Sequence, residues 1–297
     1  MIADFKISII GAGRLGGALA IALAREKIAI ETLAARNFEA AEKIAKLIEP
    51  QPKIITSDDF SKISSDVILI ATQDSEIENV AVRLAKTTNH KPQVFHTSGS
   101  LSSEILKSLK AAGCSTGSIH PLVSISDARL GAKRFADAYF CIEGDERATG
   151  TAKTLVEALG GKSFSVATEY KTLYHAAAVT ACGHLVALVD AAIEMLSGCG
   201  LNEKEARKIL LPLIGSTVEN LAEQNTAEAL TGTFARADAE TLEKHIKILS
   251  QSVSPEALGI YLQLGARSIH LAETQGASRE NLEKMRGQIL LAKKNLK

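Results

Sequence analysis

A glycine-rich turn near the start of the chain is the clearest indication of a ligand-binding site in this sequence, because of the spacing of its glycines. Gly11, Gly13 and Gly16 follow the pattern GxGxxG, between the apolar run of residues 6–10 and the helix-forming stretch of residues 18–24. In that context the first glycine permits a tight turn, the second lets the backbone approach a diphosphate, and the third lets helix and strand pack closely. Unpaired N–H groups at the helix start suit the phosphates. The turn therefore predicts a bound dinucleotide; the alternative is a structural turn in an empty domain.

The segment after the second predicted strand indicates which nicotinamide dinucleotide fits. About 20 residues beyond the glycine turn, an NAD site places Asp or Glu against the ribose 2′-hydroxyl, whereas this chain reads Ala-Ala-Arg36-Asn37. A guanidinium suits phosphate geometry, so Arg36 favours NADP over NAD. The alternative is an ordinary solvated arginine at a strand end. The residues expected to bind the cofactor are Gly11, Ala12, Gly13, Arg14, Leu15, Gly16, Arg36, Asn37, Thr72, Gln73, Thr97 and Ser98.

Three side chains are candidates for donating a proton beside the cofactor. Lys171 and His175 are four residues apart on one face of a predicted helix, and His120 ends a predicted strand. Reduction of a carbonyl or imine needs a proton donor; desolvation lowers the pKa of a lysine, and histidine titrates near neutrality. A cationic lysine could instead polarise the carbonyl oxygen. The alternatives are a solvated lysine and hydrogen-bonded structural histidines.

Other polar residues follow predicted strands or lie in loops. Ser98 and Gly99 are candidates to bind substrate, or they form a plain turn, while Asp74 fits a helix cap. Arg236 is a candidate to anchor a substrate carboxylate and Asp238 to order its loop; an ion pair explains both equally well. No metal site is expected, because the His and Cys residues lack the spacing of metal ligands.

A parallel sheet is needed to bring these residues together. Strand and helix patterns alternate up to residue 166, which is typical of βαβ units with helices on both faces; only helical patterns follow, and Pro212 is expected to kink or interrupt one. We therefore expect an α/β protein, with a Rossmann doubly wound parallel sheet in residues 1–166 and an all-α domain in residues 167–297. The expected strands cover residues 6–10, 28–33, 53–55, 66–71, 94–96, 115–119, 139–142 and 162–166.

Composition excludes several classes of partner. The 297 residues carry a formal net charge of zero, which gives no support for a nucleic-acid or anionic-membrane partner. The most apolar stretch, residues 176–196, contains His184, Asp190 and Glu194, so we expect a buried helix and no membrane span. The four cysteines show no CxxC spacing, and the first strand starts too early to follow a signal peptide. A cytoplasmic protein with reduced thiols is expected.

Several segments together resemble a known family. They are GAGRLGGALA, HTSGS, SIHPL, YHAAAV and TGTFARAD followed by His245, in this order over nearly the whole chain. They are similar to a family of NADP oxidoreductases that joins a Rossmann-like domain to a C-terminal helical domain of unknown function. The wider group contains the 6-phosphogluconate, ketopantoate and pyrroline-5-carboxylate reductases, which often carry a lysine and a polar residue where Lys171 and His175 stand. The resemblance implies a cytoplasmic NADP-binding protein that dimerises through its helical domain.

Two functions fit these observations. The first is an NADP-dependent oxidoreductase that transfers hydride between NADP(H) and a small carbonyl, imine or hydroxy compound; the second is a non-enzymatic NADP(H)-binding regulator or scaffold. An enzyme using S-adenosylmethionine is disfavoured, because that ligand has no diphosphate for the glycine turn to hold. The resemblance supplies no substrate, because the family has no agreed one. Relatives read TGP and RGD where this chain has TGT and RAD (residues 231–233 and 236–238), so substrate contacts are not transferred from them.

Overall fold

The computed structural model describes residues 5–56 and 59–296. In this part of the chain two compact units are found, one running up to Ala181 and the other starting at Cys182. The last described strand ends at Phe164, close to the predicted division between residues 166 and 167. The compact units divide later because the first turn of the following helix contacts the sheet through Lys171 and Tyr174.

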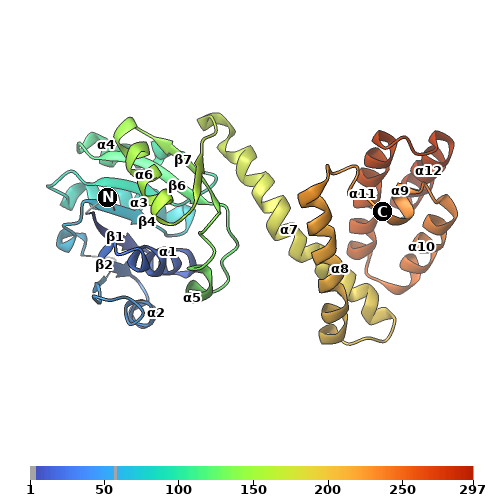
Figure 1. The fold of residues 1–297 in the computed structure, drawn as a ribbon, viewed down its shortest axis with the longest axis horizontal. Helices are drawn as coiled ribbons and strands as arrows, with labels where there is room; N and C mark the ends of the chain where they lie inside the picture. Colours follow the sequence, from blue (N-terminus) through green and yellow to red (C-terminus); the bar gives the residue numbers. More distant parts are fainter. Residues whose placement is uncertain (1–4, 57–58, 297) are drawn as a thin grey trace. The chain divides into compact units, whose positions relative to one another are not determined.

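The first unit contains a sheet of eight strands within the described residues (Figure 1). Their spatial order is β3-β2-β1-β4-β5-β6-β7-β8, which reverses direction between β1 and β4 as in a doubly wound fold. The strands are β1 (Lys6–Ile10), β2 (Ala29–Ala35), β3 (Lys53–Thr56), β4 (Val67–Ile70), β5 (Gln93–His96), β6 (Ser115–Pro121), β7 (Tyr139–Gly144) and β8 (Lys162–Phe164). The predicted α/β class is confirmed.

Helices cover both faces of this sheet. They are α1 (Arg14–Arg25), α2 (Phe38–Ala45), α3 (Asp74–Thr87), α4 (Lys107–Ala111), α5 (Ala128–Gly131) and α6 (Glu146–Ala158), with 3₁₀ helices at Phe60–Lys62, Ser103–Leu106 and Thr168–Tyr170. Alternate residues of β4 enter different cores: Val67 and Leu69 pack with α1 and α6, whereas Ile68 and Ile70 pack with α3. Burial on both faces explains why this strand is apolar throughout.

The sheet is not parallel throughout, which corrects the prediction from sequence. Strands β1 to β6 pair in parallel, but β7 pairs antiparallel with β6, and β8 then pairs in parallel with β7. The connection between β6 and β7 holds the short helix α5, which packs against α1. Because that connection contains no long crossover helix, the chain returns beside β6 in the opposite direction.

The second unit is helical in its described residues. It holds the end of α7 (Lys171–Gly198), followed by α8 (Glu203–Glu223), α9 (Gly232–Ala235), α10 (Ala239–Ser252), α11 (Pro255–Thr274) and α12 (Arg279–Asn295). Leu242, Leu262 and Met285 from α10, α11 and α12 are fully buried in one core. Helix α8 continues through Pro212, so the helix is not interrupted there, and the kink that was the other predicted outcome stays a prediction. A proline removes one backbone N–H donor from a helix, and the backbone hydrogen bonds before and after Pro212 still maintain α8.

Helix α7 is largely exposed, whereas the sequence predicts a buried helix. Residues Thr168–Gly198 are long and apolar enough to cross a membrane, yet only 6% of the most apolar window is buried. Helix α8 likewise exposes Ile209, Leu211 and Leu213. The prediction fails because an apolar sequence pattern indicates side chains that are favourably buried, but it does not indicate which part of the protein, or which partner, buries them.

Candidate functional site

A cavity of about 530 Å³ lies at the carboxyl ends of β1, β2 and β4, where the strand order reverses. Ligands of doubly wound sheets bind at this point, and the volume is in the range of small-molecule sites. The glycine turn, the segments after β2 and β4, and one side of α3 form its walls. The lining includes Gly11, Ala12, Gly13, Arg36, Asn37, Thr72, Gln73, Glu76 and Arg83.

The three glycines of the turn have different surroundings. Gly11 has a φ of +104°, and a Cβ there would lie 2.6 Å from the carbonyl oxygen of Ala71. A Cβ on Gly16 would lie 2.0 Å from the carbonyl oxygen of Gly11, so this glycine lets α1 pack onto the turn. A Cβ on Gly13 would meet no described atom within 4 Å. Gly13 therefore leaves open space in which a ligand can approach the backbone.

Two features of the cavity fit a diphosphate-containing ligand. Thr72 Oγ1 is buried and has no hydrogen-bond partner in the part of the chain that is described. Buried polar atoms are normally paired, so this hydroxyl is available to a ligand. Helix α1 starts after Gly13, and no side chain of the described residues caps it. Its first N–H groups are therefore open to an anion.

Positively charged side chains line the same cavity. Arg36 follows β2 and is exposed, while the neighbouring Asn37 accepts a hydrogen bond from the Ala40 N–H (3.0 Å) and so begins α2. Arg83 on α3 lies 4.9 Å from the centre of the Phe60 ring. Because guanidinium groups bind phosphate oxygens in a fixed geometry, the exposed Arg36 suits a further phosphate in this cavity.

Five predicted cofactor residues do not line this cavity. Arg14, Leu15 and Gly16 form the first turn of α1. Thr97 and Ser98 are buried, with Thr97 Oγ1 3.5 Å from the carbonyl oxygen of Ile70. Gly11, Ala12, Gly13, Arg36, Asn37, Thr72 and Gln73 are brought together as predicted.

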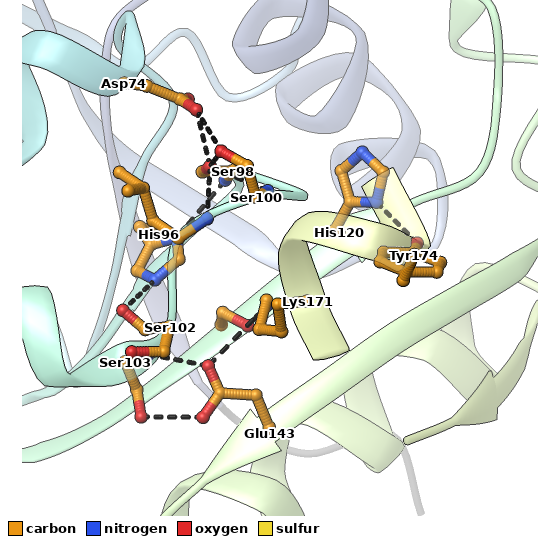
Figure 2. Close-up of polar contacts among 12 residues, drawn as sticks. Asp74, His96, Ser98, Ser100, Ser102, Ser103, His120, Glu143, Lys171 and Tyr174 are labelled. Atoms are coloured by element: carbon orange, nitrogen blue, oxygen red, sulfur yellow. Dashed lines mark hydrogen bonds and ion pairs between the residues drawn. The ribbon is translucent and has the colours of Figure 1, made fainter. Parts of the chain in front are cut away.

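Asp74 links the loops that follow β4 and β5 (Figure 2). Its Oδ2 accepts hydrogen bonds from Ser98 Oγ (2.7 Å) and Ser100 Oγ (2.9 Å). The interpretation of Asp74 as a helix cap is wrong, because Gln73 occupies the cap position and the carboxylate reaches to the neighbouring loop. The cavity wall at Thr72 and Gln73 is thereby tied to the loop that carries Gly99.

His120 and His175 meet beside Gly99. Their ring centroids are 5.7 Å apart with an interplanar angle of 80°. A Cβ on Gly99 would lie 2.6 Å from His175 Cδ2 and 2.7 Å from His120 Cε1, so only a glycine leaves room for both rings. Two predicted proton donors, 55 residues apart in sequence, thus share one place at the carboxyl end of the sheet.

His120 is held as a neutral imidazole. Burial lowers its pKa to about 4, the charges of His175 and Lys171 act in the same direction, and Asp74 opposes them. Its Nδ1 lies 2.6 Å from the hydroxyl of Tyr174 on α7 (Figure 2). At neutral pH this ring can donate one hydrogen bond and accept another, but it carries no charge.

Lys171 is almost completely buried, with 1% of its side chain exposed. Its Nζ donates a hydrogen bond to Ser118 Oγ (2.6 Å) and lies 3.5 Å from Glu143 Oε1. Glu143 also accepts hydrogen bonds from the Ser103 N–H (2.6 Å) and Ser103 Oγ (2.8 Å). The ammonium is therefore enclosed by protein groups; its hydrogen bond attaches the start of α7 to β6, and its ion pair attaches it to β7.

His96, at the end of β5, organises the loop beneath the two histidines. It is fully buried; its Nδ1 accepts from the Ser98 N–H (3.2 Å), and its Nε2 donates to the Ser102 carbonyl oxygen (3.1 Å). Burial, supported by the charge of Lys171, lowers its pKa to about 4. A neutral His96 thus holds both sides of the loop that contains Gly99.

The predicted substrate anchors Arg236 and Asp238 belong to the second unit. Asp238 begins α10 by accepting hydrogen bonds from the Thr241 N–H (3.0 Å) and Thr241 Oγ1 (2.7 Å), which lowers the pKa of its carboxyl. Arg236 ends α9. The contact of either residue with a substrate stays a prediction.

Three residues of the histidine site were missed by sequence reasoning. Tyr174 lies three residues after Lys171 and so on the same side of the helix, a signal that the spacing offered. Cys141 and Glu143 pair with His120 and Ser118 across β6 and β7. That pairing requires the antiparallel register, which no sequence pattern specified.

Comparisons with known families cover most of the chain. Residues 2–121 match a Rossmann-like domain, and residues 138–268 match DUF2520, a domain of unknown function. No curated protein matches this sequence.

Solved structures with the same fold align over nearly the full length. A protein from Bacteroides fragilis, provisionally named an NADP oxidoreductase, is 24% identical with a TM-score of 0.74, covering 91% of this chain and 99% of its own. A protein from Thermotoga maritima is 25% identical with a TM-score of 0.69 and the same coverage. Pyrroline carboxylate reductase from Plasmodium falciparum, solved with NADP bound, is 12% identical with a TM-score of 0.59, covering 97% of this chain and 99% of its own.

Proposed function

We propose that this chain, which joins a Rossmann-like domain to a DUF2520 domain, is an NADP-dependent oxidoreductase. It would transfer hydride between NADP(H) and a small carbonyl, imine or hydroxy compound. The observation that carries this proposal is the cavity at the strand switch point, which combines an open glycine turn, an unpartnered Thr72 hydroxyl and Arg36. Bound NADP supplies the hydride chemistry, and the protein supplies position and electrostatics.

Each cavity residue has a role toward the cofactor. The backbone at Gly13 and the first N–H groups of α1 would hold the diphosphate, and Thr72 Oγ1 would donate to one of its oxygens. Arg36 would contact the 2′-phosphate, which NAD lacks. The Bacteroides protein, whose name includes NADP, and the Plasmodium reductase, which was solved with NADP bound, support the choice of NADP.

The histidine pair favours an enzyme over a binding protein. His120 and His175 lie beside Gly99, and Asp74 ties the Gly99 loop to the segment that lines the cavity. Groups with strongly shifted pKa values, such as His120, cluster at the functional sites of enzymes. We assign to the two histidines the hydrogen bonds to the substrate. We assign Lys171 the role of a positioning residue, because its ammonium is buried against Ser118 and Glu143.

A second copy of this chain is the partner that we propose. In the second unit, α7 exposes 70% of Val186 and α8 exposes 63% of Leu213, among other apolar side chains. Burying these side chains in a homodimer would remove a large apolar area from water. Light scattering with size-exclusion chromatography should give a dimer, and Leu213→Glu should give a monomer. Leu130→Glu, a substitution at an exposed position on α5, is the control and should leave the dimer intact. A monomeric mass for the wild-type protein in light scattering would contradict the proposal.

Turnover with NADPH tests the proposed reaction. Purified full-length protein is mixed with NADPH and, separately, with aldehydes, ketones, 2-oxo acids and cyclic imines, while NADPH absorbance is followed. We expect substrate-dependent loss of NADPH that His120→Gln and His175→Gln each reduce without changing NADPH affinity. Tight NADPH binding with no consumption across the panel would instead support the regulator or scaffold.

A further inference from the structure

A third aromatic residue fixes the orientation of His120. The hydroxyl of Tyr174 lies 2.6 Å from His120 Nδ1, and the two rings meet edge to face with centroids 5.6 Å apart. Tyr174 also packs against Phe164 of β8, with centroids 5.8 Å apart. The phenol ring thus contacts two rings of the sheet, and its oxygen is aimed at one nitrogen of the imidazole.

The chemistry of the two groups determines the direction of this hydrogen bond. Burial raises the pKa of the Tyr174 hydroxyl, so the phenol keeps its proton at neutral pH. Cys141, which pairs with His120 across β6 and β7, offers only a weakly accepting sulfur, whereas the imidazole nitrogen that lies 2.6 Å from the hydroxyl is a strong acceptor. The phenol O–H therefore donates to Nδ1.

That order places the imidazole proton on the opposite nitrogen. When Nδ1 accepts a hydrogen bond, a neutral ring carries its proton on Nε2. Nε2 of His120 has no hydrogen-bond partner among the described residues, and the ring packs so closely on Gly99 that a Cβ there would lie only 2.8 Å from Nε2. The Nε2–H is therefore an unpartnered donor next to the Gly99 loop.

We propose that Tyr174 is a positioning residue that holds His120 as its Nε2–H tautomer, so that the ring donates a hydrogen bond to the oxygen of a carbonyl or hydroxy substrate. The inference rests on the proposed function and specifies its substrate-facing group. In the reducing direction the carbonyl carbon would gain a hydride supplied by bound NADPH, and the π electron pair would move to the oxygen. Nε2–H would stabilise the resulting alkoxide, which would then take a proton from water and leave hydroxide, with NADP⁺ as the oxidised product.

Nitrogen NMR of the imidazole rings tests the tautomer without requiring activity. In the ¹⁵N-labelled full-length protein at neutral pH, His120, assigned through the His120→Gln variant, should show a protonated Nε2 and a hydrogen-bonded, unprotonated Nδ1. In Tyr174→Phe the Nδ1 resonance should move toward that of a free unprotonated nitrogen. Tyr170→Phe, an exposed tyrosine one turn earlier, should leave it unchanged. A protonated Nδ1 in the wild type, or an unshifted Nδ1 in Tyr174→Phe, would overturn the proposal.

NADPH titration of the same samples separates this inference from the proposed function. Tyr174→Phe should bind NADPH with unchanged affinity and should lower kcat on any carbonyl substrate that the wild type reduces. The wild-type spectrum keeps the inference testable even where the variant fails to fold. Absence of NADPH binding with the expected tautomer would refute the oxidoreductase assignment, whereas NADPH binding with the other tautomer would refute the role of Tyr174 alone.

Discussion

Lys171 and Tyr174, one helical turn apart at the start of α7, contact neighbouring residue pairs on one face of the β6–β7 ladder. Lys171 contacts Ser118 and Glu143, which pair with each other, and Tyr174 contacts His120, which pairs with Cys141. Paired residues project to the same face, and so do residues two apart along a strand. The helix is therefore fixed at two points, and His175, which directly follows Tyr174, is held beside Gly99.

Replacing Lys171 with methionine should destabilise the first unit. The substitution leaves Glu143 buried with its ammonium partner removed, and breaking a buried ion pair in this way costs about 3–5 kcal/mol. Urea denaturation followed by circular dichroism measures the change. Lys153→Met, at an exposed position on α6, is the matched control and should stay within about 0.5 kcal/mol of wild type. Equal stability of the two variants would show that the Lys171–Glu143 pair does not anchor α7.

The stability of the first unit should fall as the pH drops from 6.5 to about 4. His96 has a pKa of about 4 in the fold and about 6.5 when unfolded. Between these values the unfolded state binds a proton that the folded state does not, so stability rises with pH in this window. The contribution is complete above pH 6.5, is lost at about pH 4, and amounts to about 3 kcal/mol. His120, whose pKa is lowered in the same direction, adds to the slope.

Denaturation curves at intervals across this pH window measure the effect. His96→Asn should flatten the dependence, whereas His270→Asn, at an exposed position on α11, should leave it as in wild type. A wild-type stability that is constant from pH 6.5 to 4 would mean that the buried histidines ionise in the folded protein.

Gly99→Ala should impair turnover while preserving NADPH binding. The added Cβ would approach His175 Cδ2 to 2.6 Å and His120 Cε1 to 2.7 Å, so at least one ring must move. A displacement of about 1 Å at a catalytic group can lower the rate by about 100-fold. Steady-state kinetics with NADPH and the best carbonyl substrate measure the loss, and a calorimetric titration measures NADPH affinity. Unchanged kinetics would place the reacting atoms away from the two histidines.

The sequence was sufficient to predict which residues line the cavity at the glycine turn. The strand, glycine turn and helix are consecutive in the chain, so local patterns predict Gly11, Gly13 and Arg36 together. The histidine end depends on contacts between distant segments. His120 pairs with Cys141 because β7 runs antiparallel to β6, with no crossover helix between them. Glu143 can be recognised as the partner of Lys171 only when the position of β7 in the sheet is known.

Exposure was harder to predict than secondary structure. The apolar pattern of α7 predicts a helix with the right extent, but it does not say whether the covering surface comes from the same chain. Polar residues were similarly ambiguous: Asp74 stands at a helix start, where capping is the common role, yet its carboxylate contacts Ser98 and Ser100. The local sequence does not show whether such a carboxylate accepts a hydrogen bond from its own helix start or from the loop after the next strand.

Arg36→Ala should remove the preference for the phosphorylated cofactor. Hydrogen bonds to charged groups contribute about 1.5–3 kcal/mol, which corresponds to a loss of about 10- to 100-fold in NADPH affinity. NADH affinity should be unaffected, because NADH lacks the 2′-phosphate. Arg25→Ala, at the exposed end of α1, is the control for the general loss of a positive charge. An equal loss of affinity for both cofactors would assign Arg36 to the shared part of the dinucleotide.

Isothermal titration of the wild-type protein with NADPH and with NADH tests the central claim most directly. The cavity with its open turn at Gly13, the Thr72 hydroxyl and Arg36 predicts that both nucleotides bind and that NADPH binds at least about tenfold more tightly. Equal affinities would contradict the assignment of Arg36, and the absence of heat from either nucleotide would contradict the dinucleotide site itself.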